Sequence, residues 1–103
     1  MDVPEKGFYY HYKHDPKGTL NNYAYEVMGV GHHTEEEGTH FVVYRPLYKE
    51  AFVYKNGKMF DIRPLAMFRE DVTKEGKTFP RFKKIVDPKI IAELERIKSE
   101  MYG

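Results

Sequence analysis

Arginine, tyrosine and histidine side chains recur in the middle of this sequence and on either side of it, and these residue types suit the binding of an anionic or planar ligand. Guanidinium groups hold carboxylates and phosphates through paired hydrogen bonds and stack on aromatic faces. Arg45 and Arg63 each precede a proline, and Arg81 follows one. The candidate ligand-binding residues are therefore His33, Tyr44, Arg45, Tyr48, Asp61, Arg63 and Arg81, with His11 as a further member of the group.

The same residues also have a purely structural interpretation. Arg63 has Asp61 and Glu26 available as ion-pair partners, and such pairs are common on protein surfaces. Arginine stems next to prolines cover aromatic rings while their head groups bond to the carbonyls of turns. The binding hypothesis therefore requires that Arg63, Tyr44 and His33 face one concave surface.

Metal binding and covalent catalysis have little support from the residue types. Histidines and glutamates crowd residues 32–40, but their spacing matches no established zinc signature, and such a charged run is typical of a solvated loop. The chain has no cysteine, and its sole serine is Ser99. We expect no metal, no cofactor and no catalytic residue. The competing enzyme hypothesis is a small hydrolase in which His33 acts with Glu35 or Asp61 as acid and base.

A basic segment supports a further hypothesis, a β-barrel that binds RNA or single-stranded DNA. Aromatic residues interleaved with cations stack bases and hold phosphates. The 17 basic residues of the chain are balanced by 16 acidic ones, so the total charge does not favour nucleic acid. An edge strand that lysines protect from aggregation is the structural alternative. The segment contains Lys74, Lys77, Phe79, Arg81, Phe82, Lys83 and Lys84.

The elements that position these side chains are mainly strands. Residues 41–44 are a short run of β-branched and aromatic residues that favours a buried strand. An Asn-Gly dipeptide separates residues 51–54 from residues 59–63, and this dipeptide tolerates the positive φ angles of a type I′ turn. We predict a β-hairpin here, with Asp61 and Arg63 on one face of its second strand because side chains alternate.

The rest of the sequence predicts a β-rich chain that ends in a helix. Aromatic and β-branched residues favour strands at residues 7–14 and 23–31. A proline at the first position favours a short helical turn over residues 64–68. Residues 78–86 are expected to form an extended edge segment, because they contain a proline.

The C-terminal helix is predicted over residues 89–102. Asp87 supplies an N-cap and Pro88 a first-turn proline. The apolar residues recur on one stripe, which we expect to cover the open side of the sheet. The alternative is that the stripe docks a partner or a second copy of the chain. The stripe consists of Ile90, Ile91, Leu94, Ile97 and Met101.

The length of 103 residues predicts a single domain, with a β-domain over residues 7–86 and the helix over residues 87–103. The fold class is β-dominated, all-β or α+β, with about five short antiparallel strands in a curled SH3-like sheet or barrel. We expect a monomer or a small homo-oligomer. No stretch is long and apolar enough to span a bilayer, and the N-terminus lacks an apolar signal core, so we expect a cytoplasmic protein with no membrane partner.

Short motifs occur in one order along residues 9–82. They are Tyr10-His11-Tyr12-Lys13, Tyr25-Glu26-Val27, His33-Thr34-Glu35, residues 42–48, residues 62–68, Gly76-Lys77 and Pro80-Arg81-Phe82. This pattern resembles domain-of-unknown-function family 1653 (DUF1653). The resemblance implies a small, mostly bacterial protein with a compact β-rich, SH3-like domain and no established activity.

Three features depart from that family pattern: the extra loop between Lys13 and Tyr25, the helix after Phe82, and the Phe60-Asp61 pair where family members often have a tryptophan. The function that the sequence favours is a non-catalytic binding module. We expect it to recognise a small anionic molecule, a peptide or a protein through its Arg, Tyr and His surface.

Overall fold

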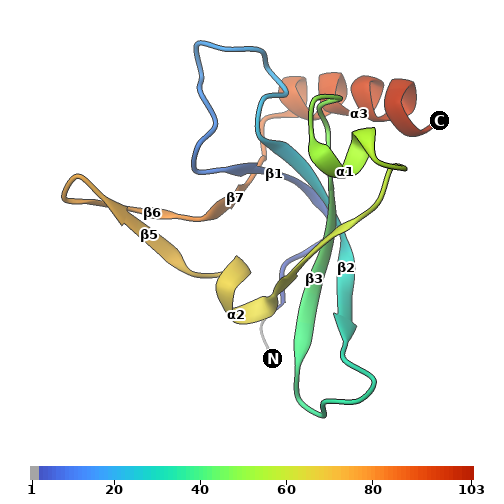
Figure 1. Cartoon of the computed structure of the whole chain (residues 1–103). Coiled ribbons are helices and arrows are strands. Elements are labelled where there is room, and N and C mark those ends of the chain that lie inside the picture. Colours follow the sequence, from blue (N-terminus) through green and yellow to red (C-terminus); the bar gives the residue numbers. More distant parts are fainter. Residues whose placement is uncertain (1–2) are drawn as a thin grey trace.

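The computed structural model describes residues 3–103, which form a curled antiparallel sheet, a projecting hairpin and a terminal helix (Figure 1). The sheet has five strands in the order β4-β3-β2-β1-β7 and is not closed into a barrel. Its strands are β1 (Gly7–His11), β2 (Ala24–His32), β3 (His40–Pro46), β4 (Asp61–Pro64) and β7 (Phe82–Lys84). The predicted β-dominated fold is confirmed.

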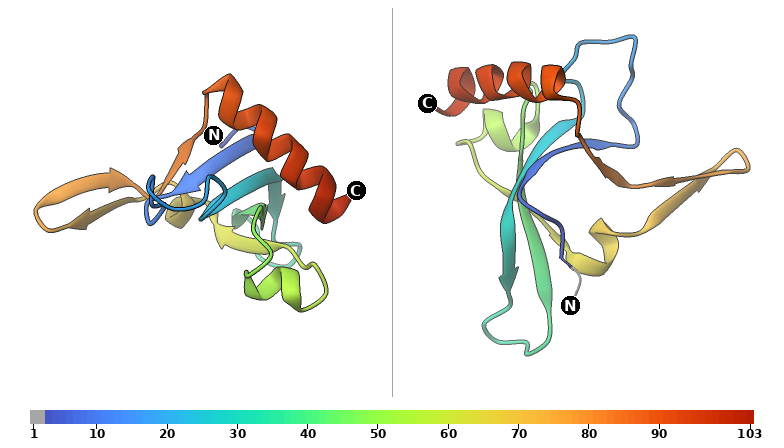
Figure 2. Two further views of the ribbon diagram at one scale, coloured as in Figure 1. Left: turned by 90° about the horizontal axis from the view of Figure 1, so that it is seen from above. Right: turned by 180° about the vertical axis from the view of Figure 1, so that it is seen from behind.

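The remaining elements lie outside this sheet. Strands β5 (Asp71–Lys74) and β6 (Lys77–Pro80) pair only with each other, and their hairpin extends away from the rest of the chain (Figure 2). Two single-turn helices, α1 (Phe52–Lys55) and α2 (Leu65–Phe68), flank β4 in sequence. The long helix α3 (Pro88–Tyr102) ends the chain.

The sheet has an apolar core on each face. Alternation along β1 sends Phe8 toward α3 and Tyr9 toward the opposite face. The core under α3 contains Phe8, Ala24, Leu47, Ile85 and Leu94. The core of the opposite, concave face contains Tyr9, Val27, Val42, Tyr44, Leu65, Phe68 and Phe82. The two faces therefore have different roles: one anchors the helix, and the other carries the polar groups described below.

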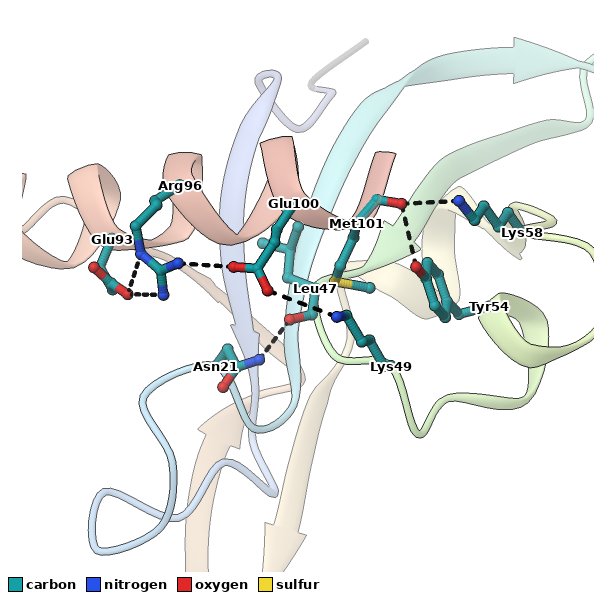
Figure 3. Close-up of polar contacts among 9 residues, drawn as sticks. All are labelled: Asn21, Leu47, Lys49, Tyr54, Lys58, Glu93, Arg96, Glu100 and Met101. Carbon is teal, nitrogen blue, oxygen red and sulfur yellow. Dashed lines mark hydrogen bonds and ion pairs between the residues drawn. The ribbon is translucent and has the colours of Figure 1, made fainter. Parts of the chain in front are cut away.

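Helix α3 forms as predicted and packs on its own sheet. The Asp87 side chain caps it by accepting a hydrogen bond of 2.9 Å from the backbone N–H of Lys89. Leu94 and Met101 on its apolar stripe are fully buried. At its end, the Met101 carbonyl accepts hydrogen bonds from the Tyr54 hydroxyl at 3.2 Å and from Lys58 Nζ at 3.1 Å (Figure 3). The Lys58 ammonium group also complements the negative end of the helix dipole.

The predicted hairpin over residues 51–63 is wrong in its first half. Residues 52–55 form α1 instead, and Asn56 has φ −108°, which a type I′ turn does not allow. The second strand exists as β4, but it pairs with β3. The physical reason is long-range: the helical turn of α1 brings Tyr54 to the end of α3, where its ring also meets the Tyr102 ring edge-on at 5.5 Å.

Other predicted elements differ only at their ends. The first strand stops at His11, three residues earlier than predicted, because the chain turns at residues 12–13. The turn helix over residues 65–68 is confirmed and buries Leu65 and Phe68. The extended segment predicted over residues 78–86 is also confirmed, as β6 and β7, which cover residues 77–80 and 82–84.

Candidate ligand-binding site

Polar side chains converge on the concave face of the sheet, opposite α3. Register explains the convergence, because Tyr44 pairs with Asp61 and Val42 pairs with Arg63 across β3 and β4. Tyr25 reaches the same face from β2, and His11 reaches it from β1. We call this group the tyrosine–arginine site, and it consists of His11, Tyr25, Tyr44, Tyr48, Asp61 and Arg63.

Three tyrosines form one side of the site. The hydroxyl groups of Tyr25 and Tyr48 are hydrogen-bonded to each other. The Tyr25 ring meets the Tyr44 ring edge-on, with 5.5 Å between centroids, and the Tyr48 ring at 5.6 Å. Edge-on pairs of this kind hold aromatic rings in fixed orientations. These three side chains therefore fix one another's positions.

Arg63 lies at the centre of the site. Its Nε donates a hydrogen bond of 3.1 Å to the Tyr44 hydroxyl, and its guanidinium carbon lies 5.6 Å from the centroid of the Phe82 ring. The side chain is half-buried. Among residues 3–103, no carboxylate lies within ion-pair distance of Arg63. A half-buried cation without a paired anion attracts an external one.

Phe82 forms the floor beneath Arg63. It is buried, and it stacks on Phe68 with 4.2 Å between ring centroids. The rings of His11, Tyr25 and Tyr44 each meet it edge-on. Phe82 therefore packs beneath the site. It is not available to stack on a base, although the nucleic-acid hypothesis gave it that role.

Burial shifts the pKa values of three groups in the site. Burial, followed by the positive charges of Arg63, Lys13 and Arg81, lowers the pKa of His11 from 6.5 to about 4. Burial raises the pKa of Asp61, and the nearby Arg63 opposes that shift. Burial also raises the pKa of Tyr25 strongly, so its hydroxyl stays protonated. At neutral pH the site thus offers phenol hydroxyl groups, a neutral imidazole, the Asp61 carboxyl group and the Arg63 guanidinium group, which is the cation that an anionic ligand would meet.

Two of the predicted site residues lie elsewhere. Arg45 points to the helix-covered face, where its Nε binds Glu26 at 2.8 Å and its guanidinium carbon lies 3.9 Å above the Tyr102 ring. His33 lies in the loop between β2 and β3, and its Nδ1 accepts the backbone N–H groups of Glu35 and Glu36 at 3.1 Å. The condition that His33 shares a concave surface with Arg63 and Tyr44 is not met.

Arg81 lies beside the site at the base of the hairpin. Its Nε donates to the Met67 carbonyl at 3.1 Å, and Nη2 lies 3.5 Å from a Glu70 carboxylate oxygen. The structure therefore brings Tyr44, Tyr48, Asp61 and Arg63 together, with Arg81 at their edge. Sequence reasoning missed Tyr25, although alternation along the YAYEV segment places it opposite Glu26 and on the face of Tyr44.

In the part of the chain that the structure describes, no group of three or more His, Asp or Glu side chains is arranged to hold a metal ion. The same residues include no helix that is long and apolar enough to cross a membrane.

Comparison with family models places this chain in a family. Residues 7–84 match the model described as protein of unknown function DUF1653. The chain belongs to this DUF1653 family. The matched range of this DUF1653 chain begins with β1 and ends with β7, so it includes every member of the tyrosine–arginine site and leaves out α3. No curated protein and no solved structure gives a significant match.

Proposed function

We propose that this DUF1653 domain is a non-catalytic binding module whose tyrosine–arginine site recognises a small ligand with an anionic group next to a planar ring. The observation that carries the proposal is Arg63, a half-buried guanidinium group set among aromatic rings without an ion-pair partner in residues 3–103. A guanidinium group in such a setting binds a carboxylate or phosphate through two parallel hydrogen bonds.

The tyrosines and Asp61 supply the rest of the recognition. The half-buried rings of Tyr25 and Tyr48 offer aromatic surface to a planar ring, whereas Tyr44 is only 4 % exposed and positions Arg63 through its hydroxyl. Asp61 is half-buried and lies on the same face as Arg63, so it offers an acceptor beside the donors. This pairing of acceptor and donor favours a ring that carries its own N–H groups, and it disfavours a simple inorganic anion.

Peptide and protein ligands remain competing hypotheses, and a cytoplasmic location and a bacterial source stay predictions. The small ligand is preferred because the polar groups of the site lie within one cluster of rings. A surface that binds a peptide would instead use the exposed apolar residues of β4 and of the segment before it. Ile62, for example, is 62 % exposed on the opposite face of the strand.

The test is an isothermal titration with adenosine monophosphate, which carries both a ring and an anion, beside adenosine and inorganic phosphate, which each carry one. We expect the monophosphate to bind more tightly than either. Arg63→Glu should abolish binding. Arg63→Lys should weaken it, because an ammonium group cannot form the two parallel hydrogen bonds of a guanidinium group.

Ile62→Glu is the matched control, because it introduces the same carboxylate side chain into the same strand on the other face. It should leave binding unchanged, and thermal melting should show that all three variants remain folded. Equal binding by wild-type protein and Arg63→Glu would refute the proposal.

A further inference from the structure

A cleft of about 590 Å³ lies beside the tyrosine–arginine site, between the end of β1 and the projecting hairpin. Exposed aromatic and basic side chains dominate its lining. They come from the turn after β1, from the residue before β2 and from the hairpin itself. We call this the hairpin cleft, and it is lined by Tyr12, Lys13, Tyr23, Lys74, Glu75, Lys77 and Phe79.

One face of the hairpin carries two lysines directly opposite each other. Lys74 pairs directly with Lys77 across β5 and β6, and like charges in that position repel. Phe79 shares their face and is 40 % exposed. The other face holds Thr73 and Thr78, whose hydroxyl groups lie 3.2 Å apart. The lysine pair and the exposed ring together give this face of the hairpin a cationic and aromatic surface.

Tyr23 joins the cleft to the tyrosine–arginine site. Its ring lies 5.7 Å from the His11 ring and 6.0 Å from the Tyr48 ring, measured between centroids, and it also lines the cleft. The residue has φ +52°, a left-handed conformation that is unusual for a bulky side chain. In this conformation the Tyr23 ring is 39 % exposed.

We propose that the hairpin cleft extends the tyrosine–arginine site into one surface for single-stranded nucleic acid. The inference rests on the proposed function, since a nucleotide is a planar ring with an anionic group. Tyr23 and Phe79 stack on successive bases, and Lys13, Lys74 and Lys77 hold the phosphates between them. Exposed rings that alternate with cations are the usual means by which proteins bind single strands without reading their sequence.

The charge of the cleft supports an anionic ligand over a neutral peptide. Three lysines face a single carboxylate, Glu75, so the cleft is basic although the whole chain is close to neutral. The rings distinguish a nucleic acid from an acidic peptide, because a peptide of glutamates has no planar group to stack.

The experiment compares an oligouridylate of about eight nucleotides, within the usual site size, with uridine monophosphate at low and high salt. We expect the oligonucleotide to bind more tightly, with a slope of log K against log salt of about −2 for three phosphate contacts. Phe79→Ala should weaken oligonucleotide binding roughly 5- to 150-fold and leave the monophosphate unaffected. Lys74→Ala and Lys77→Ala should each reduce the slope by about 0.7.

Thr78→Ala is the matched control on the opposite face of the same strand, and it should leave both affinities unchanged. The inference is overturned if the oligonucleotide binds no more tightly than the monophosphate, or if polyglutamate of similar length competes equally well. In both cases monophosphate binding that depends on Arg63 would leave the proposed function standing. If neither nucleotide ligand binds, the proposed function fails together with the inference.

Discussion

Glu26 is the position at which loss of a single charge should loosen the attachment of α3 to the sheet. Its side chain is only 11 % exposed and contacts two cations, Arg45 at 2.8 Å and Lys98 at 2.9 Å. Arg45 comes from β3 and Lys98 from α3, so the carboxylate connects the sheet with the helix. Hydrogen bonding to Glu26 is the main reason that the pKa of Lys98 is raised.

Glu26→Gln keeps the shape of the side chain and removes its charge, which leaves Arg45, whose side chain is 16 % exposed, beside a neutral amide. Breaking a buried pair costs about 3 to 5 kcal/mol. We expect about 2 to 4 kcal/mol here, because Lys98 is partly exposed and can turn toward water. Each kcal/mol lowers the melting temperature of a domain of this size by about 4 to 8 °C, so the fall should be roughly 8 to 32 °C.

Glu95→Gln is the matched control. Glu95 contacts the same Lys98, at 3.7 Å, but is 55 % exposed. Surface pairs of this kind contribute at most about 1 kcal/mol. Urea denaturation and thermal melting followed by circular dichroism would measure both variants. If Glu26→Gln melts at the same temperature as Glu95→Gln, the buried pair does not anchor the helix and the reasoning is refuted.

Three further predictions concern the concave face and the end of α3. Because the pKa of His11 is about 4 in the folded chain and 6.5 in its ordinary state, the unfolded chain takes up the extra proton between these values. The stability contributed by neutral His11 should be complete above pH 6.5 and lost as the pH falls toward 4. In His11→Gln, the free energy of unfolding from urea denaturation should depend less on pH across that range. Phe82→Ala should destabilise the protein by about 3 to 5 kcal/mol in urea denaturation, because the ring is buried in the core, whereas Phe79→Ala should leave the midpoint nearly unchanged. Tyr54→Phe should cost about 1 kcal/mol by removing a hydrogen bond to Met101, and protection of the last α3 amides from hydrogen exchange should fall with it.

Elements with local signals could be predicted from the sequence. The C-terminal helix has its cap, its first-turn proline and its apolar stripe within consecutive residues, and it forms where expected. The helical turn over residues 65–68 likewise follows a local signal, the proline that precedes it. The hairpin over residues 51–63 failed because an Asn-Gly signal is local, whereas the fate of residues 52–55 depends on the distant end of α3. Nothing in the sequence of residues 52–55 indicates that contact.

Those parts of the site that depend on which face of a strand a side chain occupies could be predicted from the sequence. Asp61 and Arg63 share a face with Tyr44, as the period of two requires. The same rule excludes Arg45, since neighbouring residues of a strand point to opposite faces, and Arg45 indeed binds Glu26 on the helix side. Tyr23 could not have been recognised, because its left-handed backbone and its contacts with His11 and Tyr48 arise only from the fold.

The measurement that tests the central claim most directly is a ¹H–¹⁵N NMR titration of the whole chain with adenosine monophosphate. The account predicts that amide shifts concentrate at the concave face, at His11, Tyr25, Tyr48 and Arg63, and that they vanish in Arg63→Glu. It also predicts that the pKa of His11 rises when the anion is bound, because a negative charge favours the imidazolium form. Shifts confined to α3 or to the loop around His33, or the same shifts in Arg63→Glu, would contradict the assignment of the site.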